Sequence, residues 1–450
     1  MPRASYRRSS RSRLLRISAL ILAIALFIDT LSLISTYNRS TQRSSSYLTN
    51  PGPNIRNQRI FIASTHWNNE RVIRSHWSTS VINLVHYFGA QNIYISIYES
   101  GSWDNTKAAL RELDTQLAAL DVPRTIILDE RTHQEELAHP PSQEGSGWIS
   151  PPPNSPKSKT QDGQQRRLEL RRIPYLARLR NLSLKPLFDL EESSAANATE
   201  NNKAFDKILF LNDVVFTTAD IRTLLATRDG DYAAACSLDF QHPPSYYDTF
   251  ALRDIDGHEA ASPTYPYFRS PISRAATLRG EVVPVRSCWN GITVFDAAPF
   301  YKEGGGLRFR STEDGLGKFG VEGSECCLVH TDNKMSGVRG VWVNTAVRVG
   351  YSGEAYKEVH AGLGASELEG EGEKKAVPPW PGSQSVFRGV WSNRYRRWTR
   401  SPALKERRVR NRVSAWKKEG KAKGEEREEK GLVCLINEMQ VLRENGWAHL

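Results

Sequence analysis

The chain of 450 residues is long enough for one large domain or two ordinary ones, with further segments at its ends. Its formal net charge of +11 would suit a nucleic-acid partner, but the basic residues concentrate in residues 1–16 and after Arg388, outside the patterned region. We therefore expect no nucleic-acid partner. The 5 cysteines include no CxxC pair, which argues against a zinc cluster and a disulfide scaffold and leaves one or two disulfides open.

The N-terminus predicts a membrane anchor. Residues 1–16 are rich in arginine and precede an apolar run over residues 17–35, about as long as one membrane crossing requires. Basic residues before such a run favour a cytoplasmic N-terminus and a lumenal remainder, which gives a single-pass signal anchor. A cleaved signal peptide is the alternative, although its apolar run would be shorter. Residues 36–58 are polar and Ser-rich, which predicts a flexible stem.

Alternating strand and helix patterns begin at Arg59. Three short apolar runs, "RIFIAS", "NIYISIYE" and "RTIILDE", predict strands, and the segments between them carry apolar residues at helical spacing. This β-α-β-α-β order predicts an α/β fold with a mixed, mostly parallel sheet flanked by helices. Ligands of such sheets bind at the carboxyl ends of the strands.

Polar segments interrupt and follow this pattern. Residues 139–165 are rich in Pro, Ser and Gly and predict a disordered insert, and a second polar insert lies near residues 192–203. Residues 361–450 are dense in charge and poor in core residues, which predicts a largely disordered tail.

The stretch "KILFLNDVVF" carries the strongest chemical signal. Its apolar run predicts a buried strand that ends at Asn212-Asp213, and carboxylate oxygens at such a place suit a divalent cation that bridges two phosphates. Sugar-nucleotide enzymes of the GT-A type usually carry Asp-x-Asp there, whereas this chain has only "ND". The alternative, an Asx turn that caps the next helix, explains the two residues equally well.

Downstream stretches offer further candidates. "YAAACSLDF" predicts a strand ending in Asp239, and Trp289-Asn290-Gly291 would suit stacking on a sugar and hydrogen bonding to its hydroxyls. Glu325 could orient an acceptor hydroxyl or act as a base, and His330 or Asp332 could complete a metal shell. The alternatives are a buried tryptophan and a structural histidine.

The first half of the chain offers residues for a nucleotide. Ser64 and Thr65 follow the first predicted strand, and Glu99 at the end of the second could accept ribose hydroxyls. Arg172 and Arg180 could neutralise a diphosphate. For each of these, a surface ion pair or hydrogen bond is the alternative.

Six stretches in order resemble the fungal capsule-associated α-1,3-mannosyltransferases of glycosyltransferase family 69: "YISIYESGSWDNTKAAL", "RIPYLARLRNLSLKPL", "KILFLNDVVF", "CSLDF", "SCWNGITVFDAAPF" and "SECCLVHTD". The resemblance covers residues 59–360, the expected catalytic domain. It implies a GT-A-like fold and a type II Golgi membrane enzyme that adds α-1,3-mannose from GDP-mannose to a glycan or polysaccharide, with retention of configuration and a divalent cation, Mn²⁺ or Mg²⁺. Some relatives are linked to capsule assembly or export, so a non-catalytic role stays open, as does a different sugar.

The resemblance also carries roles onto individual residues. Asp213, beside Asn212, takes the place of the family's metal or diphosphate ligand. Arg180 belongs to the pair Arg180-Asn181 in the helix-like stretch "RIPYLARLRNLSLKPL". The donor motif contributes Glu99, Ser100 and Asp104, and the catalytic candidates are Asp213, Glu325 and Asp239. Three N-x-S/T sequons occur, of which Asn38 and Asn197 predict N-glycosylation, whereas we expect Asn181 to be unmodified.

Overall fold

The computed structural model describes residues 13–28, 30–32, 35, 55–150, 168–197, 204–360, 383–399 and 401–449. One helix, Arg13–Ser32, is long and apolar enough to cross a membrane by length and composition, with a mean hydropathy of 2.2, and a signal sequence would pass the same test. The predicted stem lies outside the described residues except for a short 3₁₀ helix at Ile55–Asn57. Residues 151–165 of the predicted disordered insert also lie outside, whereas Trp148–Ile149 form a short strand, β4.

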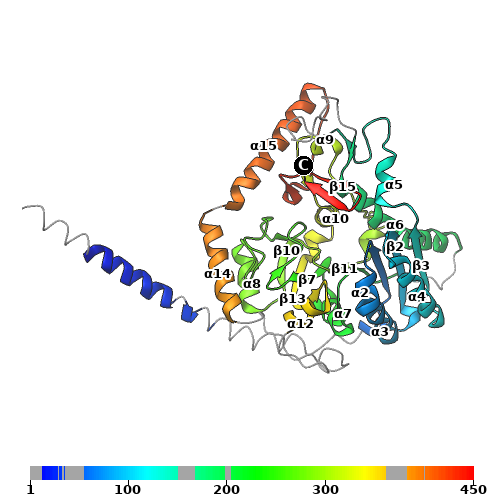
Figure 1. Cartoon of the computed structure of the whole chain (residues 1–450), viewed down its shortest axis with the longest axis horizontal. Helices are drawn as coiled ribbons and strands as arrows, with labels where there is room; N and C mark the ends of the chain where they lie inside the picture. The colour runs from blue at the N-terminus through cyan, green and yellow to red at the C-terminus, as the bar shows by residue number, and fades with distance from the viewer. Residues whose placement is uncertain are drawn as a thin grey trace, which may run out of the picture.

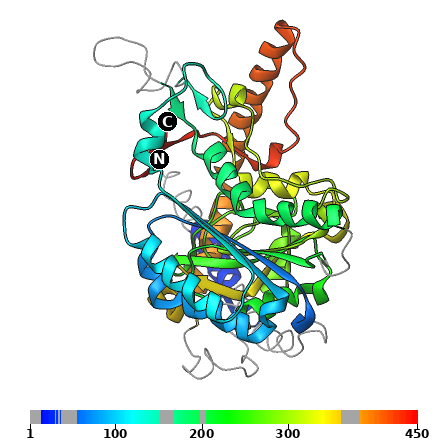
Figure 2. The same ribbon diagram turned by 90° about the vertical axis from the view of Figure 1, so that its right-hand side faces the viewer.

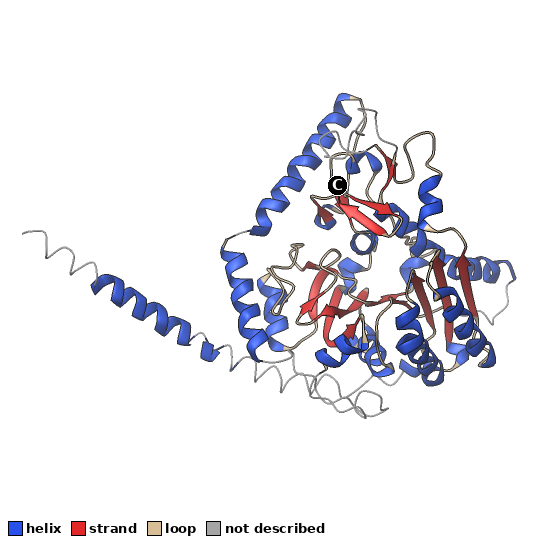
Figure 3. Cartoon of the chain, viewed as in Figure 1, coloured by secondary structure: helices blue, strands red, loops and turns tan. Residues whose placement is uncertain are grey.

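A twisted sheet forms the centre of the molecule, and Figure 3 shows it between helices on both sides. Within the described residues it has 10 strands, in the order β3-β2-β1-β6-β11-β7-β13-β10-β9 with β8 paired to β7. Most strands run in one direction, whereas β8, β10 and β11 run in the opposite one. The predicted fold class, a mixed and mostly parallel sheet flanked by helices, is confirmed.

The strands are β1 (Ile60–His66), β2 (Ile93–Ser100), β3 (Arg124–Asp129), β5 (Glu169–Leu170), β6 (Lys207–Leu211), β7 (Ala234–His242), β8 (Ser245–Tyr246), β9 (Arg253–Asp254), β10 (Val283–Ser287), β11 (Ile292–Asp296), β12 (Glu322–Gly323), β13 (Val341–Gly350), β14 (Leu435–Ile436), β15 (Gln440–Arg443) and β16 (Gly446–His449). The helices are α2 (Glu70–Val72), α3 (Ser78–Phe88), α4 (Thr106–Ala119), α5 (His133–Ala138), α6 (Arg172–Asn197), α7 (Thr218–Leu225), α8 (Pro271–Arg279), α9 (Asp314–Gly317), α10 (Glu325–Asp332), α11 (Ser336–Arg339), α12 (Gly353–Val359), α14 (Ser383–Trp398) and α15 (Ser401–Ala422), and Figure 1 labels most of them.

Both faces of the central strands are buried, which explains their continuous apolar runs. Successive side chains of a strand point to opposite faces, so Ile60 and Ile62 of β1 pack toward α3, α4 and α7. Phe61 and Ala63 pack toward the other face, where α6, α8 and α10 contribute buried residues. Figure 2 shows helices on the two sides of the sheet.

The C-terminal segment is ordered where the structure describes it, so the predicted disordered tail is wrong for residues 383–399 and 401–449. The charges of α15 lie on its exposed side, while Val409, Val413 and Trp416 recur at helical spacing and pack against Leu316 and Leu435. Strand β14 pairs with β12 of the sheet domain. The high average charge of residues 361–450 therefore did not reveal the apolar stripe of α15 that is buried against the domain.

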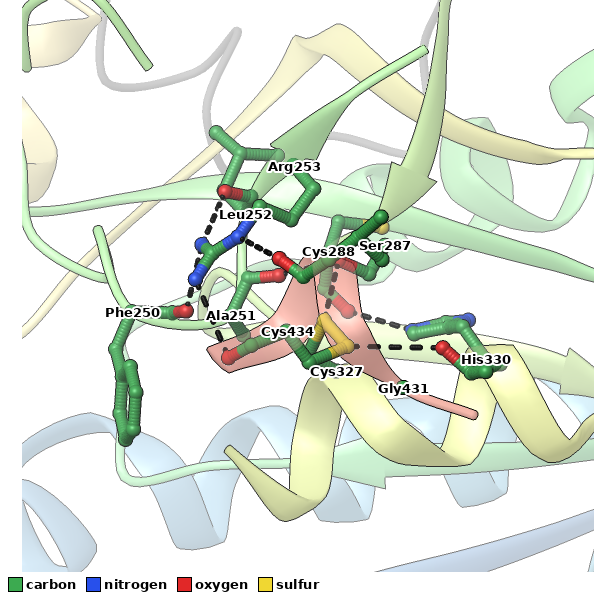
Figure 4. Close-up of a disulfide and its surroundings, with 12 residues drawn as sticks. Phe250, Ala251, Leu252, Arg253, Ser287, Cys288, Cys327, His330, Gly431 and Cys434 are labelled. Atoms are coloured by element: carbon green, nitrogen blue, oxygen red, sulfur yellow. Dashed lines mark hydrogen bonds between the residues drawn. A yellow bond between two sulfur atoms is a disulfide. The ribbon is translucent and has the colours of Figure 1, made fainter. Parts of the chain in front are cut away.

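A disulfide attaches this segment to the domain, and Figure 4 shows its surroundings. Cys327 in α10 is bonded to Cys434, 107 residues further along the chain. The buried guanidinium of Arg253 donates to the carbonyls of Phe250 at 2.9 Å and of Cys434 at 3.4 Å. A second disulfide, Cys236–Cys288, joins β7 to the residue after β10.

Replacing both partners of the first disulfide, Cys327→Ser with Cys434→Ser, should lower the free energy of unfolding by about 2–4 kcal/mol, because a bond that closes a long loop restricts the unfolded chain. Denaturant unfolding of the full chain in detergent measures the change, and limited proteolysis should cut after residue 399 faster than in the wild type. An unchanged unfolding midpoint and cleavage rate would contradict the docked arrangement. Ser336→Ala, a polar exchange elsewhere on the domain, is the control.

Candidate active site

Asp213 lies at the carboxyl end of β6, beside the loop that follows β1. Its Oδ2 accepts a hydrogen bond of 2.8 Å from Asn69 Nδ2, and Trp77 Nε1 donates to the Asn212 carbonyl at 3.0 Å. Burial raises the pKa of Asp213, while its own backbone N–H and Asn69 act in the opposite direction. The alternative of a helix cap is wrong, because Thr217 caps α7 in a capping box with Asp220.

Three of the predicted donor residues hold the loops after β1 and β2 instead of facing a ligand. Ser64 Oγ donates to the Leu211 carbonyl at 2.6 Å, and Ser100 Oγ donates to the His66 carbonyl at 3.4 Å. Glu99 is fully buried, accepts from the Ser102 backbone and pairs with Lys107 at 3.1 Å. Direct donor contact is therefore a wrong prediction for these three buried side chains.

Two further predicted donor residues stand beside them. Asp104 accepts from the backbone N–H groups of Thr106 and Glu70 at 3.0 and 3.1 Å, so it orders the start of α4 against α2. Thr65 is partly exposed at the end of β1. Asn69, which the sequence analysis did not single out, is the residue that joins this side of the site to Asp213.

Asp239 of β7 is fully buried beneath the site. It accepts from Asn290 Nδ2 and the Tyr351 hydroxyl, both at 3.0 Å, and from the backbone N–H of Asp248 at 3.2 Å. Burial and the neighbouring Asp248 charge raise the pKa of Asp239 to about 6. Asp239 thus positions Asp248 and Tyr351. The sequence analysis missed both residues; the only signal was the "YYD" stretch after the strand, which contains Asp248.

The Trp289-Asn290-Gly291 turn is buried in the core beneath the site, so its predicted contact with a sugar is wrong. Gly291 has φ 84°, and a Cβ there would lie 2.5 Å from Val349 Cγ2 and 3.0 Å from Asp239 Cβ. Asn290 is fully buried, and Trp289 is only 3% exposed. The Trp289 indole packs against Phe210, Phe295 and Phe309.

Arg180 and Glu325 form one ion pair of the site. Arg180 Nε lies 2.9 Å from Glu325 Oε1, and its guanidinium lies over the Trp289 ring at 4.3 Å. Glu325 begins α10, and its side chain is 3% exposed. Arg180 therefore carries a charge that one carboxylate already balances.

Two neighbouring arginines at the start of α6 differ in their partners. Arg171 is fully buried and pairs with Glu322 at 2.5 Å and Asp314 at 2.8 Å. Arg172 Nη1 donates to Gln440 Oε1 at 2.6 Å, and within the described part of the chain no carboxylate forms an ion pair with it. Burial lowers the pKa of Arg172, while the charges of Glu325, Tyr247 and Asp248 oppose this shift. A cation so placed suits an anionic ligand.

The predicted metal ligands His330 and Asp332 do not join Asp213. His330 stacks on Phe295 and hydrogen-bonds the Cys288 carbonyl at 2.8 Å, and Asp332 pairs with Arg310 at 2.6 Å. Both lie in α10, but His330 points into the core, whereas Asp332 points toward residues 428–430. Among the described residues, no group of three His, Cys, Asp or Glu ligand atoms within 4.8 Å includes Asp213. This part of the prediction is wrong.

Of the predicted glycosylation sites, Asn38 lies outside the described residues and Asn197 ends α6, where only its backbone is described. Asn181 uses both atoms of its amide within the protein. Its Nδ2 donates to the Phe309 carbonyl at 2.8 Å, and its Oδ1 accepts from the Phe309 N–H at 3.0 Å. That it is unmodified stays a prediction.

Residues 59–332, more than half of the chain and all of the site described above except Tyr351 and Gln440, match the family described as cryptococcal mannosyltransferase 1. The chain belongs to this family. The family is one of mannosyltransferases, so the resemblance drawn from the sequence is confirmed and the molecule is a glycosyltransferase by family. No curated protein sequence matches the chain.

Several solved structures are distantly similar to this family member. Mannosyltransferase PcManGT from Pyrobaculum calidifontis, solved with GDP-Man and Mn²⁺, is 11% identical, with 87% of this chain and 86% of that chain covered and a TM-score of 0.32. TarS 1–349 of S. aureus is 10% identical, with 63% of this chain and 57% of that chain covered and a TM-score of 0.31. Glucosyl-3-phosphoglycerate synthase from Mycobacterium tuberculosis is 11% identical, with 65% and 70% covered and a TM-score of 0.28.

Because His330 is a core residue, its titration should affect stability. Burial lowers the pKa of His330 from 6.5 to about 4, so the folded state resists a proton that the unfolded chain accepts. Burial of the neutral His330 ring therefore costs nothing in protonation above pH 6.5. As the pH falls from 6.5 toward 4, the free energy of unfolding should decrease by about 1.4 kcal/mol per pH unit because of this one group. The variant His330→Asn should show a correspondingly weaker dependence of unfolding free energy on pH in this window.

Denaturant unfolding between pH 7 and pH 4.5 measures this slope. The same exchange at exposed His86 controls for the removal of a histidine as such. If wild type and His330→Asn lose stability in parallel, the core placement of His330 is refuted.

Proposed function

We propose that this chain is a mannosyltransferase that moves mannose from GDP-mannose to a hydroxyl of a glycan or polysaccharide acceptor. One observation carries the proposal. Within the region that matches a mannosyltransferase family, the carboxylate of Asp213 at the end of β6 is bound by the Asn69 amide at 2.8 Å, and Arg172 at the start of α6 forms no ion pair with a carboxylate of the described residues. A sugar nucleotide needs this combination, since its diphosphate binds to cations and its metal binds to a carboxylate.

The site residues fit a divalent cation held mainly by the donor. Asp213 offers a single protein carboxylate, and Mg²⁺-type ions are commonly bound through one or two carboxylates plus substrate phosphates and water. We propose Mn²⁺, or Mg²⁺, in this role. When bound, the cation would supply positive charge to the diphosphate. Arg172 would bind the same phosphates, and the paired Arg180 would stabilise the charge that develops on them as the bond breaks.

The transfer breaks the bond between the mannose anomeric carbon and the diphosphate and forms one from that carbon to the acceptor oxygen. For an α-1,3 product with retained configuration, the acceptor attacks from the side that the diphosphate leaves, and its proton passes to the departing phosphate oxygen. No protein nucleophile is then required. Arg180 binds Glu325 through Oε1 at 2.9 Å, and the second carboxylate oxygen of Glu325 would orient the acceptor hydroxyl.

We propose further that the enzyme is a single-pass type II protein of the Golgi membrane with its catalytic domain in the lumen. The apolar helix Arg13–Ser32 and the preceding arginines support this orientation. The disulfides Cys236–Cys288 and Cys327–Cys434 of the described residues support an oxidising compartment.

A donor screen on the detergent-solubilised full chain tests the function. We expect GDP-mannose with Mn²⁺ to be turned over in preference to UDP-sugars, and chelation of the cation to abolish turnover. Asp213→Ala should reduce kcat/KM for GDP-mannose by about 100-fold or more, as expected when a preorganised charged group is lost. Asp231→Ala removes an exposed carboxylate at the opposite edge of the sheet and serves as the control.

Undiminished turnover by Asp213→Ala would refute its assigned role. Binding of GDP-mannose without transfer to any mannoside would refute the transferase and favour a polysaccharide assembly or export protein.

A further inference from the structure

The hairpin of β15 and β16 closes one side of the candidate site. It lies over the start of α6, where Arg171 forms a bridge with Val441 and Gln440 accepts from Arg172 at 2.6 Å. Leu442 is buried with residues of β2, β4, β5 and α6, and Arg443 pairs with Glu169. In Figure 1 strand β15 of the hairpin lies above the sheet. This position is fixed by several independent contacts and by the Cys327–Cys434 bond.

Trp447 is the large apolar side chain that this hairpin leaves open. It pairs with buried Leu442 across the hairpin, but its own side chain is 43% exposed. The guanidinium of Arg172 covers one ring face, 3.8 Å from the centroid, which fixes the ring orientation. An exposed indole held rigidly in this way is a preformed surface for a ligand with apolar faces.

Arg172 connects this ring to the proposed reaction centre. Arg172 and Arg180 lie on the same helix, α6, about 12 Å apart along its axis. Arg180 pairs with Glu325 at 2.9 Å, and Arg172 contacts Trp447. Tyr247 is also 46% exposed. A ligand that extends from Glu325 along α6 toward Arg172 would reach Trp447, whose ring Arg172 covers.

We propose that Trp447 is the stacking platform of an acceptor subsite, which binds a sugar ring of an extended oligosaccharide beyond the sugar that receives the mannose. This inference rests on the proposed function and adds to it a substrate class, an oligosaccharide instead of a single sugar. The platform lies in the C-terminal segment, outside residues 59–332 that match the family. The matched region thus contains the donor residues and Glu325, and the hairpin would add a contact for a longer acceptor.

Acceptor kinetics on the full chain in detergent test the subsite. We expect Trp447→Ala to raise the KM for α-mannotetraose by roughly tenfold, the loss expected for one stacked ring, while the KM for methyl α-mannoside changes little. Trp447→Phe should restore most of the affinity for the tetraose, which a purely structural role of the hairpin would not predict. Trp398→Ala, an exchange at an exposed tryptophan of α14, is the control.

Direct binding of α-mannotetraose, measured by saturation-transfer NMR without donor, separates this inference from the proposed function. Weaker binding by Trp447→Ala than by wild type, with unfolding midpoints unchanged, supports the subsite even if no mannose transfer is found. Equal tetraose binding and equal KM in wild type and Trp447→Ala overturn the subsite, even if GDP-mannose turnover is normal.

Discussion

The pairing of β1 with β2 on one side and β6 on the other is the constraint on which the site depends. Parallel pairing with both faces buried aligns the ends of these strands at one edge, so the loops after β1 and β6 meet there. The Asn69–Asp213 hydrogen bond is the direct result of that alignment. A shift of one residue in β1 would exchange its two buried faces and separate these loops.

Charge balance divides the arginines around this edge into two groups. Arg171 and Arg180 are matched by Glu322 of β12 and Glu325 of α10, so these ion pairs hold α6 and the residue before it against β12 and α10. A desolvated charge without such a match is unfavourable in the isolated protein and becomes favourable when an anion arrives. Arg172 has this character, with an amide and an indole as its neighbours. Stability is therefore assigned to Arg171 and ligand affinity to Arg172, two adjacent residues where α6 begins.

Local pattern was sufficient to predict the sheet and the position of Asp213, because a buried run that stops at a polar residue marks a strand end in any context. It failed for Trp289 and His330, whose surroundings come from distant elements that no local pattern specifies. It failed for the C-terminal segment because charge density averages over a helix, whereas burial depends on the single stripe that carries Val413 and Trp416. Asn69 and Tyr247 were missed because each lies in an irregular loop.

The disulfide between Cys327 and Cys434 joins α10, which begins with Glu325, to the C-terminal segment that carries Trp447. Cys327 follows Glu325 by two residues in α10, and Cys434 precedes the hairpin that carries Trp447. The Cys327–Cys434 disulfide therefore helps to fix the position of Trp447 relative to Glu325. A chain kept under reducing conditions would lack the covalent link between α10 and the segment that carries the hairpin.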